Sequence, residues 1–176
     1  MISRILTLAL LVATLAGLTG CAQRSPADTP FINANYQAGD ALLDQLHHRL
    51  PPDSTLLVAT LANIDAFERS STFGRLASEQ ISARFTQSGF QMIEMKFRNS
   101  VYILQNQGEL MLTRELHDLA REHAAAAVIV GTYGEAKDRI YVNLKVIQPE
   151  TNIVQAVYDY ALPIDDDMRM LMRSKR

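Results

Sequence analysis

The sequence has a single cysteine, Cys21, among 176 residues, and it has no tryptophan. A lone cysteine cannot form a disulfide within the chain, so the stability of the fold must come from a packed core. The chain also lacks an excess of either charge: 17 lysines and arginines stand against 19 aspartates and glutamates, a net charge of −2. Because proteins that bind nucleic acid carry a basic surface, this composition argues against a nucleic-acid partner.

The sequence also lacks the motifs of nucleotide-binding and hydrolytic enzymes. It contains no Walker loop, no Gly-x-Ser-x-Gly and no Gly-x-Gly-x-x-Gly. Gly131 and Gly134 follow an apolar run but precede a predicted hairpin rather than a helix, so no helix N-terminus is available there to hold a phosphate. We interpret this glycine pair as a tight turn.

The four histidines do not have the spacing of metal ligands. His47 and His48 are adjacent, and neighbouring side chains on a helix point about 100° apart. The separation of His117 from His123 also misaligns them on a helix. We therefore predict no metal site and no cofactor.

Carboxylates and hydroxyls offer no catalytic set either. Glu115 and Asp118 are explained by a solvated helix face, and Ser70 and Ser71 by helix capping. We expect that the protein is not an enzyme. A hydrolase or a small-ligand binder stays open as a further hypothesis, and it would require a pocket with convergent polar groups.

The chain begins with a short apolar leader. Met1–Arg4 carries one positive charge, and Ile5–Leu18 is almost wholly apolar. This run is shorter than the roughly 20 residues that span a bilayer, and its small-residue end is typical of a signal peptide over residues 1–20. Leu18-Thr19-Gly20-Cys21 resembles a bacterial lipobox. In lipoproteins of that type the cysteine takes a diacylglycerol, the leader is cut before it, and the new amine is acylated.

We therefore interpret Cys21 as the lipidation site, with a diacylglycerol and an N-acyl chain such as palmitate. A thiolate is a good nucleophile for this reaction, and several acyl chains make a membrane anchor stable. By resemblance to lipoproteins of Gram-negative bacteria, Ala22 instead of aspartate favours the outer membrane. The alternative, a signal peptide cut elsewhere with Cys21 an incidental thiol, stays open.

The rest of the chain predicts one domain. Residues 21–33 contain two prolines and small polar residues, which are typical of a flexible tether. Apolar periodicity predicts helices that start near residues 35, 72 and 113 and strands over 55–61, 90–97, 128–133, 139–148 and 153–162, with a possible strand at 101–104. Val154 is expected on the same side of its strand as Ala156. Residues 164–176 form a tail that is either a short helix or a frayed end.

Alternating helices and strands predict parallel pairing, and the last two strands predict an antiparallel hairpin. We expect an α/β (α+β) domain over residues 34–163. Its single mixed β-sheet would have about five to six strands, with about three helices packed mainly on one face. Edge strands of such a sheet are candidate surfaces for a homo-oligomer.

Several ordered stretches behind the lipobox resemble the FlgO family of flagellar outer-membrane lipoproteins. They are Asn35–Leu43, Leu57–Asp65, Ser70–Ile81, Gly108–Leu116, Val130–Tyr133 and Tyr158–Tyr160. The resemblance implies a fold similar to the N-terminal domain of TolB, and a lipid-anchored domain that faces the periplasm. It also implies a structural or assembly role, with flagellar ring proteins as partners, in an outer ring of the basal body that affects motility.

The resemblance brings no catalytic residues. It implies architectural roles: Gly74 allows a close helix approach, Gly89 ends a helix, and Arg114 caps or pairs locally. The alternative to a flagellar role is a different envelope adaptor, which regulates cell-wall synthesis or belongs to a secretion assembly.

Overall fold

The computed structural model describes residues 29–67, 71–95, 102–104 and 110–173. The helices are α2 (Pro30–Leu46), α3 (Thr72–Gln87), α4 (Arg114–Glu122) and α5 (Asp166–Met172), and the strands are β1 (Thr55–Ala59), β2 (Ala62–Asn63), β3 (Gln91–Met95), β4 (Tyr102–Leu104), β5 (Leu110–Leu112), β6 (Ala127–Glu135), β7 (Arg139–Ile147) and β8 (Val154–Pro163).

The main sheet has the strand order β3-β1-β6-β7-β8, and the short β2 pairs with β6. Strands β3, β1 and β6 run parallel, whereas β6, β7 and β8 form an antiparallel meander. Strands β4 and β5 make a separate two-stranded ribbon. The predicted mixed sheet with a closing hairpin is therefore confirmed.

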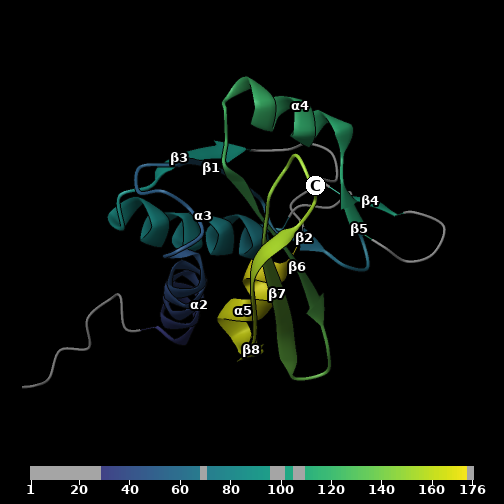
Figure 1. The fold of residues 1–176 in the computed structure, drawn as a ribbon. Helices are drawn as coiled ribbons and strands as arrows, with labels where there is room; N and C mark the ends of the chain where they lie inside the picture. Colours follow the sequence, from purple (N-terminus) through teal and green to yellow (C-terminus); the bar gives the residue numbers. More distant parts are fainter. Residues whose placement is uncertain (1–28, 68–70, 96–101, 105–109, 174–176) are drawn as a thin grey trace, which may run out of the picture.

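The sheet buries both of its faces to different extents. Helices α2, α3 and α5 share the larger core cluster with one face, which includes Phe73, Phe85, Ile129 and Leu144. Helix α4 lies on the opposite side (Figure 1), where Leu116 and Ala120 pack against residues of β3, β1 and β6 and against Ile147 at the end of β7. The prediction of helices mainly on one face holds for three helices, and α4 is the exception.

Helix α2 begins earlier than predicted. Pro30 occupies its first turn, and the Thr29 hydroxyl accepts a hydrogen bond from the Ile32 amide at 3.3 Å. Residues 30–33 were predicted to belong to the tether, because proline is also typical of linkers. Proline is favoured at the first helical position, since its missing N–H would have no partner there. Burial of Phe31 shows that this turn belongs to the fold.

The other helix boundaries follow the expected chemistry. Ser71 caps α3, Thr113 caps α4, and Gly89 follows α3 with a φ of 96°, as predicted. The C-terminal tail is helical from Asp166, and the Asp165 carboxylate caps it. The structure therefore selects the helical alternative for this tail.

The predicted turn at Gly131 and Gly134 is wrong, because both glycines lie inside β6. At Gly131 a Cβ atom would lie 2.7 Å from Leu144 Cδ2 and 2.9 Å from the Asn143 carbonyl oxygen. The neighbouring strand and Leu61 approach too closely there for any side chain. This glycine therefore serves packing inside the sheet.

Strand β8 contains a register shift opposite the Val146/Ile147 step. Ala156, Tyr158 and Tyr160 face the large core, as predicted. Val154 pairs with Ile147 beyond the irregularity and is exposed, so its predicted place beside Ala156 is wrong. An extra residue in one strand moves the following side chain to the other face.

Candidate functional site

The predicted leader, residues 1–20, and Cys21 lie outside the described residues, as does Ser70. Lipid attachment at Cys21 therefore stays a prediction. Across the described part of the chain, none of the helices has the length and apolar character needed to span a bilayer.

Two of the predicted surface histidines lie closer together than expected. His47 caps the C-terminus of α2, and the His47 and His48 Nδ1 atoms are 3.5 Å apart, with ring centroids separated by 4.7 Å. The helical separation of about 100° does not apply because α2 ends at Leu46. Within the described ranges, no group of three or more His, Cys, Asp or Glu side chains is placed to hold a metal ion.

The carboxylates of α4 lie on a solvated face, as predicted. Asp118 is 3.5 Å from Arg121 and 4.0 Å from Arg114, and all three side chains are exposed. Exposed pairs of this kind contribute little to stability. Arg114 therefore pairs locally, as the family resemblance implied.

A buried hydroxyl pair joins β6 to the start of α3. The Tyr133 phenol donates a hydrogen bond of 2.6 Å to the Ser71 hydroxyl, which also accepts the Gly74 amide at 3.0 Å. Burial raises the pKa of Tyr133, and its hydrogen bonds to Ser71 and Asn63 only partly oppose this effect. This pair fixes the helix cap against the sheet and leaves no free nucleophile.

Gly74 sits at the closest point of that junction. A Cβ atom on Gly74 would lie 2.3 Å from the Leu61 carbonyl oxygen and 3.2 Å from the Tyr133 ring. Any side chain would push α3 away from the sheet. The architectural role that the resemblance implied for Gly74 is therefore confirmed.

A second polar network ties α2, α3 and β8 together. The Tyr160 phenol donates to the Asn35 side-chain oxygen, and the Asn35 amide donates to the Gln80 oxygen at 2.6 Å. Asn35 is fully buried. Burial, followed by the nearby Tyr158, raises the pKa of Tyr160. A buried amide needs such partners, since an unpaired one is costly.

The crossing of α2 and α3 depends on Gly39. A Cβ atom at Gly39 would lie 2.9 Å from Arg84 Cβ. Arg84 then pairs with Asp40 at 2.7 Å and lies over the Tyr36 ring, 5.5 Å from its centroid. Of the six stretches that carry the family resemblance, all but Gly108–Leu116 contribute residues to these contacts between helices and strands.

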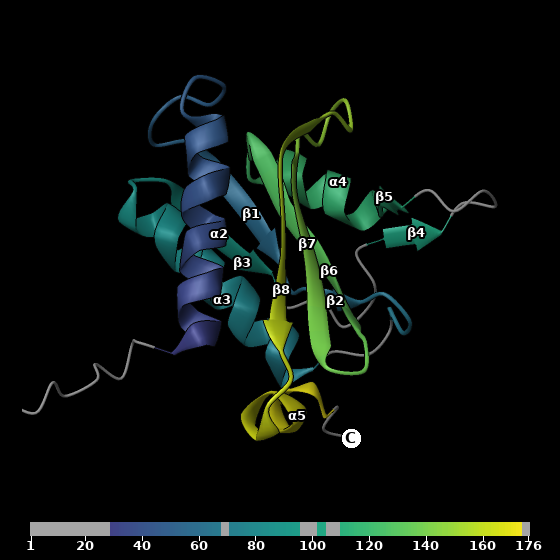
Figure 2. The ribbon, with the colours of Figure 1, turned by 90° about the horizontal axis from the view of Figure 1, so that it is seen from below.

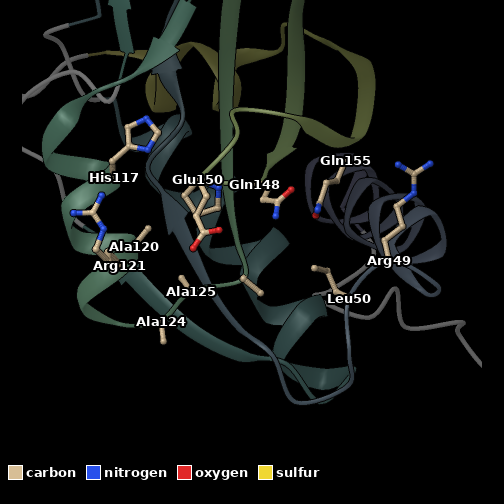
Figure 3. A pocket seen from close by; sticks show the side chains of 12 residues that line it. Arg49, Leu50, His117, Ala120, Arg121, Ala124, Ala125, Gln148, Glu150 and Gln155 are labelled. Carbon is tan, nitrogen blue, oxygen red and sulfur yellow. The ribbon is translucent and has the colours of Figure 1, made fainter.

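A polar groove of about 480 Å³ lies at one end of the sheet. Figure 3 shows Glu150 in the middle of the groove, with His117 and Arg121 on one side and Arg49 and Gln155 on the other. The floor consists of small apolar side chains from the end of α4 and the segment before β6. These polar groups come from separate elements, and none of them is a serine, cysteine or threonine nucleophile paired with a base.

Two local features of this groove are unusual. Gln155 Oε1 is buried and has no hydrogen-bond partner among the described residues. Ala124 has a φ of 48°, a left-handed conformation that an alanine adopts at a cost. Neither feature could be predicted from the sequence, because one depends on the bulge in β8 and the other on where α4 ends.

The comparisons with known proteins agree with this architecture. The LpoB C-terminal domain from Salmonella enterica has a TM-score of 0.56 and 12% sequence identity, with coverage of 76% of this chain and 98% of that one. For the LpoB C-terminal domain from Escherichia coli the TM-score is 0.54, the identity is 14%, and the coverage is again 76% and 98%. At these identities the likeness shows the fold alone.

A comparison with curated proteins finds no match. The family model described as FlgO protein matches residues 36–167, which is most of the chain. The buried contacts at Asn35, Gly39, Ser71, Gly74 and Tyr133 give the resemblance a structural basis. The chain belongs to the FlgO family.

Proposed function

We propose that the protein is an outer-membrane lipoprotein that faces the periplasm and has a structural or assembly role at the flagellar basal body. The observation that carries this proposal is the FlgO family match over residues 36–167. The lipobox-like sequence that ends at Cys21 supports the anchor. Flagellar ring proteins are the partners that this role requires.

The use of polar side chains in the fold supports a structural role over a catalytic one. Ser71, Tyr133, Asn35 and Tyr160 are all engaged in buried hydrogen bonds between elements. Catalytic residues, by contrast, are held next to a site where a substrate atom can sit. A protein whose buried polar groups join helices to strands is suited to hold a rigid shape for a partner.

Deletion of the gene in a flagellated host tests this role. We expect impaired swimming and a lost or destabilised outer ring when the flagellar base is imaged in intact cells. Expression of the full chain from a plasmid should restore both. Normal motility together with an unchanged basal body would contradict the flagellar role.

The second candidate is an envelope adaptor outside the flagellum, for instance in cell-wall synthesis or in a secretion assembly. Its support is that the chain shares its fold with the LpoB domains. Purification of the tagged full chain from solubilised membranes discriminates between the two roles. Flagellar ring proteins among the bound partners favour the first role, whereas cell-wall synthases favour the second.

A further inference from the structure

Exposed apolar side chains are concentrated on one region of the surface. Of the large hydrophobic residues that are exposed in the described part of the chain, all but Met170 lie on the β7–β8 hairpin or beside it. They are Ile64, Tyr141, Ile153, Val154 and Val157. Large apolar patches on a folded domain mark surfaces that bind another molecule.

Tyr141 and Val157 of this group lie on the part of the sheet that α4 leaves open, and Ile64 borders it. Figure 2 shows β7 and β8 beyond the region that α4 covers. Strand pairing places side chains of this face in rows, which are Arg139–Pro163, Gly134–Tyr141–Ala161, Thr132–Asn143–Asp159 and Lys145–Val157. Paired residues share a face, so these rows define the open face, a name we keep below.

The open face carries a projection next to a hollow. Tyr141 is 57% exposed and stands between Gly134 and Ala161, whose small size leaves space on either side. A hollow of about 680 Å³ adjoins Tyr141 and is bordered by Ile64. A surface that presents a large aromatic side chain beside such a hollow is complementary in shape to a rotated copy of itself.

The charges of the open face are self-complementary as well. Its strand positions carry two cations, Lys145 and Arg139, and one anion, Asp159, which also accepts a hydrogen bond from Asn143. Lys145 and Asp159 lie in adjacent rows on adjacent strands. A second copy turned by a two-fold axis brings Lys145 of each molecule to Asp159 of the other.

We propose that the open face binds a second copy of this chain in a two-fold, face-to-face dimer. Tyr141 of each molecule enters the hollow of the other, and two reciprocal Lys145–Asp159 pairs set the register. Aromatic side chains that fill a pocket at the centre of an interface supply much of its binding energy. This association needs neither the lipid anchor nor a flagellum, so it can fail while the proposed function stands, and the reverse.

The test is sedimentation velocity of the full chain, purified from membranes in a density-matched detergent, at about 1–100 µM. We expect a concentration-dependent dimer. Tyr141→Ser should weaken it at least about tenfold. Met170→Ser, which removes the exposed hydrophobic side chain on α5, is the matched control and should leave the dimer unchanged. Circular dichroism and thermal melting confirm that each variant is folded.

Charge reversal tests the two-fold arrangement itself. Lys145→Asp alone places two carboxylates together at each contact, and Asp159→Lys alone places two ammonium groups together. The dimer affinity of each variant should therefore fall at least about tenfold. An equimolar mixture of the two should dimerise again, because each mixed dimer regains both opposite-charge pairs.

Three results would overturn the proposal. The first is a chain that stays monomeric at about 100 µM, which would leave the open face to another kind of molecule. The second is a dimer that survives Tyr141→Ser and both charge reversals. The third is a failure of the mixture to dimerise when each single variant is folded and monomeric.

Discussion

Ala124 and Gly89 occupy the same position in two copies of one motif. After α4 the Ala125 amide bonds to the Ala120 carbonyl, and after α3 the Phe90 amide bonds to the Phe85 carbonyl, at 2.8 and 3.1 Å. In each case the residue that follows the cap has a positive φ, 48° at Ala124 and 96° at Gly89. Glycine adopts this conformation freely, whereas alanine does not.

Ala124→Gly should therefore stabilise the protein by about 0.5–1 kcal/mol, because relief of the left-handed strain exceeds the entropy that glycine adds to the unfolded chain. Gly89→Ala is the reciprocal control and should cost about 1 kcal/mol. Urea unfolding of the full chain measures both. A loss of stability in Ala124→Gly would show that the alanine methyl group contributes packing that outweighs the strain.

The buried phenols of Tyr133 and Tyr160 should make the free energy of unfolding depend on pH in the alkaline range. Burial raises the pKa of both phenols, so each keeps its proton to higher pH in the folded state than in the unfolded chain. Their contribution is complete below the unfolded value of about 10, and it is lost as the pH rises toward the folded pKa values. The slope is at most about 1.4 kcal/mol per pH unit for each tyrosine.

Urea unfolding between about pH 8 and pH 11 checks this prediction, since that range spans the unfolded pKa. The double variant Tyr133→Phe/Tyr160→Phe should lose stability at pH 8, because two buried hydrogen bonds are gone, by about 1 kcal/mol each. It should nevertheless show a shallower decline toward pH 11. An unchanged slope would mean that these phenols do not couple folding to pH.

At the scale of elements, helix α2 protects the free edge of β8. The Gln45 amide donates to the Val157 carbonyl at 2.9 Å, and the Val157 amide donates to the Gln45 oxygen at 3.2 Å. A side-chain amide thus takes the place that the backbone of a further strand would occupy. Edge strands need such protection, because their unpaired backbone groups recruit other chains.

Gln45→Ala should remove both the donor to the Val157 carbonyl and the acceptor of the Val157 amide. We expect exchange of the Val157 amide hydrogen to accelerate by about tenfold, which corresponds to the roughly 1.4 kcal/mol expected from one lost pair of bonds. Hydrogen exchange measured residue by residue tests this. Gln37→Ala, an exposed position of the same helix, is the matched control. Equal protection in both variants would rule out the edge-protection role.

Most of these elements could be predicted from the sequence. Alternation of Ile140, Val142 and Leu144 predicted β7, and Ser71 and Gly89 marked both ends of α3, since these signals are local. The start of α2 and the register of β8 were missed. Pro30 has two common uses that only packing distinguishes, and a bulge leaves no mark in an alternating pattern.

The candidate site and the open face were harder to predict from the sequence than the fold. The hydrogen bonds between Tyr133 and Ser71 and between Tyr160 and Asn35 join residues far apart in sequence. No local sequence pattern therefore predicts them. The open face depends on where α4 lies over the sheet, because the strand pattern alone marks Tyr141 only as the outward member of an alternating pair. Tertiary arrangement decides which outward residues are covered.

At the scale of the whole molecule, the structure presents a FlgO-family domain whose helix α2 begins at Pro30, shortly after the predicted lipid attachment site at Cys21. The proposed role needs both parts. In that role the fold would supply a shape for neighbouring proteins, and the acyl chains proposed at Cys21 would hold it at the membrane. Loss of the anchor should therefore release the domain from the membrane without unfolding it.

The amount of the full chain in flagellar basal bodies isolated with their surrounding outer membrane tests this account most directly. The wild-type chain and Cys21→Ser would be expressed at equal levels in the deletion strain and quantified by immunoblot. We predict that the wild-type chain is retained in the basal bodies and that Cys21→Ser is depleted from them. Absence of the wild-type chain from the basal bodies, or equal retention of Cys21→Ser, would contradict the account.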